Sequence, residues 1–538
     1  MRAMPFPPVS SVAPEPGPRR RLLILAICCM SLLIVSLDNT VLNVALPSMR
    51  SELGASVAGM QWTIDAYTLV LASLLMLAGS TADRVGRRRV FATGLVLFTT
   101  GSLLCSLAPT LEALIAFRML QAVGGSMLNP VAMSIITNTF TDPRERARAI
   151  GVWGGVVGVS LAAGPVIGGL LVDSVGWRSI FWLNLPVGLL ALGLTLRYVP
   201  ESRAPRPRRA DPVGQVLVML LLGSLTYGII EAPHAPAWVL WTCGTVATLS
   251  LVGLVRYELR RAEPLIDPRF FRSAPFSGAV VIAVCAFAGL SGFLFLNTLY
   301  LQDVRGLSAL EAGLYMLPMA ALTFVFAPLS GRLVGTRGPR LPLLVAGAAM
   351  GASGLLFAVG WAGGVGGVGG VGGVGGAGWV GGAGWVGGAG GAGAAGGAGA
   401  AGGVEGSDAV LFASYVLFGL GFGLVNAPIT NTAVSGMPRA QAGVAAAVAS
   451  TSRQTGGTLG VAVIGAVLAG GLAQGADFVD AARVAWWVIT ACGLAVLVVG
   501  AATTGRWAAA TAGRVGKAGG GELPEGRKGA TRGPGLRS

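Results

Sequence analysis

The chain has few charged residues for its length. Of its 538 residues, 11% are charged and 53% are hydrophobic, whereas about a quarter of the residues in a soluble domain are charged. This shortage excludes an ordinary soluble protein. It predicts an all-α polytopic membrane protein, because a helix satisfies its own backbone hydrogen bonds inside lipid.

Residues that hold metal ions or form disulfides are also scarce. The sequence has one histidine, and its six cysteines fall inside apolar stretches with no metal-ligand or disulfide spacing. We therefore interpret the cysteines as packing residues and expect no metal site. The phosphate-binding pattern Gly-x-x-x-x-Gly-Lys-Ser/Thr does not occur, so we expect no ATP site, and we expect no other cofactor. No loop carries a nucleophile, an acid pair or a metal-binding cluster, so we expect no enzymatic activity.

Lysine is nearly absent, and arginine supplies almost all of the positive charge. The sequence has 36 Arg and 2 Lys, and its net charge is +15. A protein this basic could bind nucleic acid, but its arginines stand in short stretches between apolar runs. That distribution orients membrane spans, so we expect the lipid bilayer as a partner and no nucleic acid.

About 20 apolar residues are needed for each crossing of a bilayer. On that measure the sequence predicts 14 spans, at about residues 22–46, 62–82, 90–107, 112–138, 149–172, 178–199, 213–232, 238–256, 275–300, 309–330, 342–361, 408–432, 443–469 and 483–503. With this topology, 32 of the 38 Lys and Arg lie on one side, four lie on the other, and Arg118 and Arg453 lie within spans. Since basic loops stay inside the cell, we expect both termini in the cytoplasm and the protein in a bacterial cytoplasmic membrane.

The segment after the second predicted span carries a more specific pattern. It reads Gly79-Ser-Thr-Ala-Asp83-Arg84-Val-Gly86-Arg87-Arg88. Any cytoplasmic loop can be rich in arginine, but the order Gly-x-x-x-Asp-Arg-x-Gly-Arg-Arg resembles the signature loop between spans 2 and 3 of the major facilitator superfamily. The resemblance implies a cytoplasmic gate formed by Gly79, Asp83, Arg84, Gly86, Arg87 and Arg88.

A similar pattern recurs after span 10, at Gly331, Gly335, Gly338 and Arg340. The two copies indicate six helices, two inserted helices and six further helices, and parallel halves of this kind build the superfamily. We therefore predict the major facilitator fold, two six-helix bundles plus two inserted helices. Its expected segments are a disordered tail at 1–21, a bundle at 22–199, the inserted helices at 200–274, a bundle at 275–503 with an external glycine-rich loop at 362–407, and a disordered basic tail at 504–538.

Three charged residues lie inside predicted spans of the first bundle, where charge is costly and marks a candidate functional site. At about 1.5 Å of rise per residue, Asp38, Asp65 and Arg118 lie about 12, 5 and 9 Å from the outer ends of their spans. An arginine stays charged, whereas an aspartate in a dry environment can take up a proton. We predict that these residues couple proton movement. The alternatives are a structural ion pair for Asp38 and Arg118, and an interfacial position for Asp65.

Polar residues inside spans are candidates for the wall of a substrate cavity. On the fourth span, Arg118, Gln121, Gly125 and Asn129 follow helical spacing, and we expect this polar face to look into a cavity rather than into lipid. Arg453 lies deep in span 13 and has no evident acidic partner. The further candidates are Asn43, Asn426 and Asn431.

The fifth span contains small residues and a proline at helical spacing, namely Gly158, Gly164, Pro165, Gly168 and Gly169. Close helix packing alone would explain them. The arrangement is also similar to a motif of the proton-driven exporters of the superfamily. The runs Asp38–Pro47 and Trp177–Gly188 add a resemblance to its 14-span drug:proton antiporters.

This resemblance implies a monomeric exporter that exchanges protons for a small amphipathic organic compound, such as an aromatic antibiotic, by alternating access. Length and composition favour self-resistance in an antibiotic producer. The alternatives are a proton-coupled importer of a small nutrient and a membrane sensor without transport. The fifth-span motif disfavours the importer.

Overall fold

The computed structural model describes residues 17–204, 211–261, 267–364, 401–435, 437, 442–505, 507–508 and 510–512. Within these residues every regular element is helical, and 14 helical stretches are long and apolar enough to cross a membrane. The predicted all-α fold with 14 spans is therefore confirmed.

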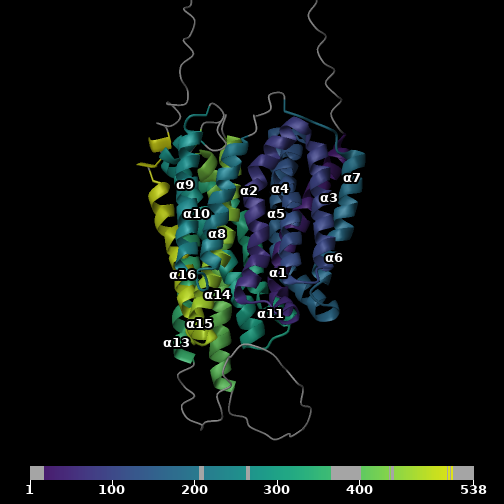
Figure 1. The fold of residues 1–538 in the computed structure, drawn as a ribbon. Coiled ribbons are helices and arrows are strands. Elements are labelled where there is room, and N and C mark those ends of the chain that lie inside the picture. The colour runs from purple at the N-terminus through teal and green to yellow at the C-terminus, as the bar shows by residue number, and fades with distance from the viewer. Residues whose placement is uncertain are drawn as a thin grey trace, which may run out of the picture.

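The first six crossings form an N-terminal bundle (Figure 1). They are α1 (Pro18–Leu53), α2 (Val57–Val85), α3 (Arg87–Ser106), α4 (Leu111–Thr139), α5 (Pro143–Val175), and the pair α6 (Ser179–Trp182) and α7 (Asn184–Tyr198). Two inserted helices follow, α8 (Pro212–Ile230) and α9 (Ala237–Glu258).

The last six crossings form a C-terminal bundle, preceded by a short 3-10 helix, η1 (Pro268–Arg272). They are α10 (Ala274–Leu299) with its π-helical extension η2 (Tyr300–Val304), α11 (Ala309–Tyr315) with α12 (Leu317–Arg337), α13 (Arg340–Gly364), α14 (Ala401–Ser435), α15 (Ala442–Ala473) and α16 (Phe478–Thr503).

The two bundles repeat one packing pattern. In the first, α1 packs against α5 and α7, and α4 packs against α2 and α3. In the second, α10 packs against α15 and α16, and α14 packs against α12 and α13. Between the bundles, α2 contacts α15 and α5 contacts α12. The second crossing of each bundle therefore packs against the fifth crossing of the other. This is the arrangement of two parallel halves that the sequence repeat predicts.

The inserted helices lie along one of the two seams between the bundles. Helix α8 packs against α2 and α15, and α9 packs against α8. Gln215 of α8 donates a hydrogen bond to the backbone oxygen of Ser73 on α2. Near the other end of α8, Trp62 Nε1 donates to Glu231 Oε1 at 2.9 Å. Helix α8 therefore covers the α2–α15 seam, whereas the α5–α12 seam has no such cover among the described helices.

Both copies of the repeated motif end a helix in the same way. Gly86 follows α2 with φ 126°, and Gly338 follows α12 with φ 79°. A residue with a side chain is strained at these angles, whereas glycine adopts them readily. Each glycine therefore allows the tight reversal into the next crossing.

Two boundaries that differ from the prediction have a clear cause. Residues 79–85 belong to α2 rather than to a loop, because Gly86 alone separates α2 from α3. The span expected at 309–330 is divided into α11 and α12, and Pro318 follows the break. Proline lacks the N–H group that would continue the hydrogen bonds of the preceding turn. Most of the expected glycine-rich loop, residues 365–400, lies outside the described residues, and the expected segment limits stay a prediction.

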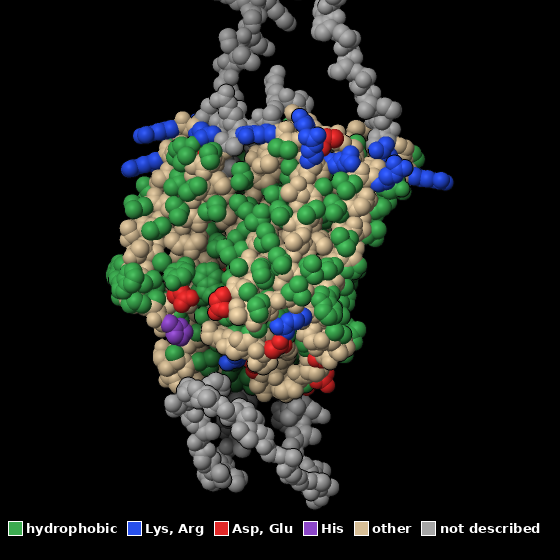
Figure 2. Space-filling view, turned by 45° about the vertical axis from the view of Figure 1, so that its right-hand side comes forward, with side chains coloured by type: hydrophobic (Ala, Val, Ile, Leu, Met, Phe, Trp, Pro, Cys, Tyr) green, Lys and Arg blue, Asp and Glu red, His purple; other side chains and the backbone are tan. Residues whose placement is uncertain are grey.

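The basic residues gather at one end of the molecule. Figure 2 shows most of the arginine side chains that it colours in a rim above the apolar flank. We call this the arginine-rich end, and it is the end at which α2 stops and α3 begins. The apolar flank below it matches the surface that lipid would cover.

Candidate functional site

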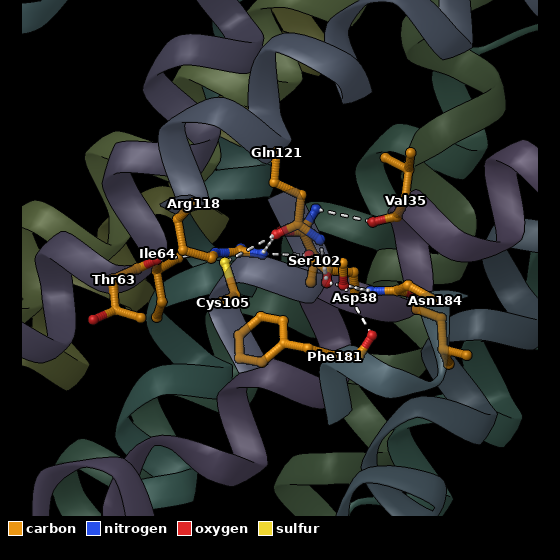
Figure 3. Close-up of polar contacts among 12 residues, drawn as sticks. Val35, Asp38, Thr63, Ile64, Ser102, Cys105, Arg118, Gln121, Phe181 and Asn184 are labelled. Atoms are coloured by element: carbon orange, nitrogen blue, oxygen red, sulfur yellow. Dashed lines mark hydrogen bonds and ion pairs between the residues drawn. The ribbon is translucent and has the colours of Figure 1, made fainter. Parts of the chain in front are cut away.

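A buried ion pair joins α1 to α4 in the N-terminal bundle (Figure 3). Arg118 Nη1 donates to Asp38 Oδ2 at 2.5 Å. The Arg118 side chain is fully buried, and 2% of the Asp38 side chain is exposed. Two charges this far from water are retained in a fold only if each finds its partner. The structure thus brings together two of the three residues expected to couple protons, while their role stays a prediction.

Neutral donors and acceptors from three further helices surround the pair. Asp38 Oδ1 accepts hydrogen bonds from Gln121 Nε2 at 2.9 Å and from Asn184 Nδ2 at 2.8 Å. Arg118 Nη1 also donates to Gln121 Oε1 at 2.8 Å, and Arg118 Nε donates to the backbone oxygen of Thr63 at 3.4 Å. Asn184 in turn donates to Ser102 Oγ at 3.0 Å. The carboxylate is therefore held by several bonds from different helices.

Asn184 and Ser102 were not predicted as site residues. Asn184 lies in the Trp177–Gly188 run that carries the family resemblance, but nothing in that run shows that it faces Asp38. Ser102 lies on α3, where a serine can satisfy its hydroxyl on its own helix; here it donates to the backbone oxygen of Phe181 at 2.9 Å. Both side chains lie in the ion-pair network, and only the fold places them there.

One nitrogen of the Arg118 guanidinium, Nη2, forms no hydrogen bond with the described residues. The guanidinium carbon lies 4.1 Å from the centre of the Tyr67 ring, a cation–π contact that helps to hold the charge. Its Nη2 is buried and has no hydrogen-bond partner among the described residues. An arginine in this place is a fixed positive charge, so a change of charge at the site has to come from Asp38.

Asp65 lies apart from the ion pair. It is fully buried on α2, and neither carboxyl oxygen has a hydrogen-bond partner among the described residues. Gln61 and Thr68 lie about one turn before and one turn after Asp65 on the same face of α2, and both bond to α15. Gln61 Nε2 donates to the Val461 oxygen at 3.1 Å, and Thr458 Oγ1 donates to Thr68 Oγ1 at 2.8 Å. Asp65 thus lies on the face of α2 that meets the C-terminal bundle and is shielded from solvent there; its depth in the membrane and its role stay predictions.

Three of the four residues on the polar face of α4, Arg118, Gln121 and Gly125, are buried among neighbouring helices. Gln121 is fully buried between the ion pair and Cys105, and a Cβ atom at Gly125 would lie 2.9 Å from the Tyr67 hydroxyl. Asn129 is partly buried, and its side-chain oxygen has no described partner. Other protein groups can satisfy a polar face as well as water can, and they do so for Gln121; a place for Asn129 on a cavity wall stays a prediction.

A cavity of about 500 Å³ lies instead in the C-terminal bundle, near the arginine-rich end. It is lined by Gly331 and Val334 of α12 and by Ala427, Thr430, Asn431, Val434 and Ser435 of α14. Of the predicted cavity residues, Asn431 lies on this wall. Arg453 of α15 reaches it through Thr430, whose Oγ1 accepts from Arg453 Nη2 at 2.5 Å.

The remaining two cavity candidates lie elsewhere. Asn43 donates to the backbone oxygen of Asn39 on its own helix at 2.8 Å. Asn426 stands one turn before Thr430 on α14, and its backbone oxygen accepts from the Thr430 hydroxyl at 3.3 Å. Neither side chain lines the cavity.

The small residues of α5 make two different close contacts. A Cβ atom at Gly164 would lie 2.0 Å from Thr40 Oγ1 of α1, and one at Gly168 would lie 3.0 Å from Val41 Cγ1. On another face, a Cβ atom at Gly169 would lie 2.5 Å from the backbone of Leu310 on α11. The motif therefore packs α5 within its own bundle and also against the other one.

Contacts between the bundles gather toward the end opposite the arginines. Gly169 meets α11 there, and Arg50 forms an ion pair with Asp303 at 3.1 Å. Closer to the arginine-rich end, a Cβ atom at Gly158 would still lie 3.2 Å from Phe324 of α12, but one at Gly154 would find no atom within 4 Å. The described structure is thus closed at the far end and open at the arginine-rich end.

The repeated motif at the arginine-rich end is tied to its own bundle. Arg87 Nη2 donates to Asp83 Oδ1 at 2.9 Å, and the Arg88 backbone N–H donates to Glu201 Oε1 at 3.1 Å. A Cβ atom at Gly86 would lie 2.6 Å from the same Glu201 oxygen. Glu201, in the segment after α7, was not among the expected residues, because one acid between two spans gives no sign of what it contacts.

The Asp83–Arg87 contact leads to a prediction about turnover. The pair joins the end of α2 to the first residue of α3 and is partly exposed. Ion pairs close to solvent contribute at most about 1 kcal/mol to stability, so Asp83→Asn should leave the fold intact. If the motif acts as a gate, the substitution should slow turnover several-fold and leave drug binding unchanged, since a gate contact changes the balance between conformations. Single-turnover and binding measurements on purified protein separate the two. Unchanged turnover with weaker binding would contradict the gating role.

Comparison with known proteins places these features in context. Residues 28–383 match the sequence profile of the Major Facilitator Superfamily. The chain is 34% identical over 458 residues to the multidrug resistance protein Stp of Mycobacterium tuberculosis (strain CDC 1551 / Oshkosh), an alignment that covers 84% of this chain and 76% of that protein. It is also 34% identical over 466 residues to the tetracenomycin C resistance and export protein of Streptomyces glaucescens, covering 86% and 78% of the two chains.

A solved structure shares the fold. The crystal structure of a D-xylose-proton symporter superposes with a TM-score of 0.58 at 13% identity, covering 89% of this chain and 97% of that one. At this identity the likeness concerns the arrangement of helices and says nothing about which compound is carried or in which direction.

Proposed function

The chain belongs to the major facilitator superfamily, and we propose that it exports a small amphipathic organic compound in exchange for protons. Relatives that align with most of the chain are named as multidrug resistance and antibiotic export proteins. The observation that carries the proposal is the buried Asp38–Arg118 pair, because it holds an acid that can change charge beside a cation that cannot.

The named relatives favour drug or antibiotic export without singling out one compound. The multidrug protein and the tetracenomycin C exporter are equally identical to this chain, at 34%. The earlier expectation of self-resistance in an antibiotic producer fits one of these relatives and not the other. We therefore propose an amphipathic, aromatic substrate as the class, and an antibiotic as its natural example.

Orientation follows from the charge distribution. The arginine-rich end faces the cytoplasm, because basic segments resist transfer across the membrane, and both termini then lie in the cytoplasm of a bacterial cell. The open cavity beside Asn431 faces the same side. In this conformation the protein is ready to take up a compound from the cytoplasm, which is the loading step of an exporter.

Proton and substrate sites lie in different bundles. The ion pair belongs to α1 and α4, and the cavity belongs to α12 and α14. No residue is shared between them, so coupling has to pass through the relative movement of the bundles. The α2–α15 contact is suited to this role, because α15 carries Arg453 near the cavity and Thr458 at the seam with α2. We propose that one chain completes the cycle without a cofactor.

Drug accumulation in cells tests the proposal. Cells that express the chain should hold less of a fluorescent aromatic drug than cells without it, and an uncoupler should remove the difference, since each proton contributes about 2.3 kcal/mol per 100 mV of membrane potential. Higher accumulation that the uncoupler abolishes would indicate a proton-coupled importer. No effect on any compound tested, from a chain shown to reach the membrane, would favour a sensor.

A further inference from the structure

Two arginines lie within the spans away from their ends, and they differ in how their charge is balanced: Arg118 is fully buried, and Arg453 is half-buried. Arg118 is paired with Asp38. Arg453 forms no ion pair with a described carboxylate; its Nη2 donates to the neutral Thr430 hydroxyl, and its Nε is buried without a hydrogen-bond partner. An arginine remains charged in such a place, so the C-terminal bundle holds a positive charge with no counter-charge.

No acid in the rest of the bundle compensates for it. Residues 275–503 contain six acids, and all of them lie toward the end opposite the arginines, in η2, in α11 or close to the first residues of α14 and α16: Asp303, Glu311, Glu405, Asp408, Asp477 and Asp480. The arginine-rich end of the same bundle carries Arg332, Arg337 and Arg340 instead. Since those exposed arginines are screened by solvent and salt, the positive potential inside the cavity comes mainly from Arg453, and it attracts anions and repels cations.

The cavity beside Arg453 suits a small organic molecule. Its volume of about 500 Å³ falls within the usual range for drug-sized ligands, about 300–1,000 Å³. Val334, Ala427 and Val434 give it apolar walls, and Thr430, Asn431 and Ser435 give it hydrogen-bonding groups. An apolar body with one polar, negatively charged end matches both features.

We propose that the substrate loaded here is an amphipathic monoanion, an apolar ring system that carries one ionised carboxylate, phenolate or enolate. Arg453 binds the charged oxygen beside Thr430, because Nη2 has a second hydrogen and Nε is free. This inference rests on the proposed export function and narrows its substrate to one charge class. It predicts discrimination against cationic drugs of the same shape.

Three anthracene derivatives of similar size provide the test: the carboxylate, the neutral carboxamide and the cationic aminomethyl compound. Proton-driven uptake of each fluorophore is measured in everted vesicles, which expose the arginine-rich end. Wild type should carry the carboxylate best and the amine least. Arg453→Gln should raise the KM for the carboxylate about tenfold or more, since a charge-assisted hydrogen bond is lost, and should leave the KM for the amide within about threefold.

Two variants separate binding from general effects of charge. Arg453→Lys keeps the charge without the planar fork, so it should retain more carboxylate transport than Arg453→Gln. Arg337→Gln removes an exposed arginine of the same bundle and should change no KM by more than about twofold, because exposed charges are screened by solvent and salt. An equal loss for all three fluorophores in Arg453→Gln would show a structural role and overturn the inference.

The remaining outcomes distinguish this inference from the export function itself. Uncoupler-sensitive transport of the amine, with none of the carboxylate, would overturn the inference and leave proton-driven export standing. Transport of none of the three compounds would contradict both. Vesicles of phosphatidylcholine with and without phosphatidylglycerol test whether a lipid headgroup is the anion. Equal carboxylate transport in both supports an organic substrate, and competitive inhibition by phosphatidylglycerol contradicts it.

Discussion

Replacing Asp38 with Asn should reduce proton-driven efflux to the level of cells without the gene. Asn has nearly the same shape as Asp and can keep one bond from Asn184 or Gln121, but it cannot bind and release a proton. Drug accumulation with and without an uncoupler measures the effect. Full resistance in this variant at normal expression would remove Asp38 from the mechanism.

Loss of activity in Asp38→Asn alone has a second possible cause. Arg118 would remain fully buried without its counter-charge, and breaking a buried pair in this way costs about 3–5 kcal/mol of folding free energy. A structural ion pair that only fixes the packing of α1 against α4 would therefore give the same loss. The single variant cannot distinguish the two roles.

The double variant Asp38→Asn with Arg118→Gln separates them. It removes both charges together, so no buried charge is left unpaired, and thermal stability in detergent should recover most of what the single variant lost. Transport should stay absent, because no group at the site can carry a proton. Recovered transport in the double variant would show that the pair serves packing alone.

Long-range organisation was predictable because it depends on composition. Apolar runs that alternate with arginine-rich stretches predicted the 14 spans. The two copies of the glycine motif predicted two similar halves, and each copy ends a helix at a glycine with positive φ. The contact between Asp38 and Arg118 could also be predicted, since two opposite charges buried in one bundle stabilise each other.

Side-chain partners from distant segments were not predictable. Asn184 and Glu201 are ordinary polar residues in sequence, and only the packing of α7 and the segment after it brings them to Asp38 and to the motif after α2. The polar face of α4 is a second example in which the sequence did not reveal the partners of a side chain. Its pattern indicated a cavity, but Gln121 bonds to Asp38 of α1 and to Arg118 of α4 itself.

Replacing Gly169 with Leu should abolish efflux by preventing the bundles from closing at the end opposite the arginines. A Cβ atom at this position would lie 2.5 Å from the Leu310 Cα and from the Ala309 oxygen. Both are backbone atoms of α11, so α5 and α11 have to move apart. Overpacking of this kind costs about 1–3 kcal/mol, which shifts the balance between conformations about 5- to 150-fold against the state described here.

Thiol labelling reports that shift directly. A cysteine placed at Asn431, in a chain whose six native cysteines are replaced, should react with a membrane-impermeant reagent in everted vesicles, because Asn431 lines the open cavity. Gly169→Leu should lower the labelling rate and the efflux together. Gly193→Leu is the matched control, since a Cβ atom there meets nothing within 4 Å, and it should change neither. Normal efflux with unchanged labelling in Gly169→Leu would show that this contact does not control the closed end, and that the glycines of α5 serve packing within their own bundle.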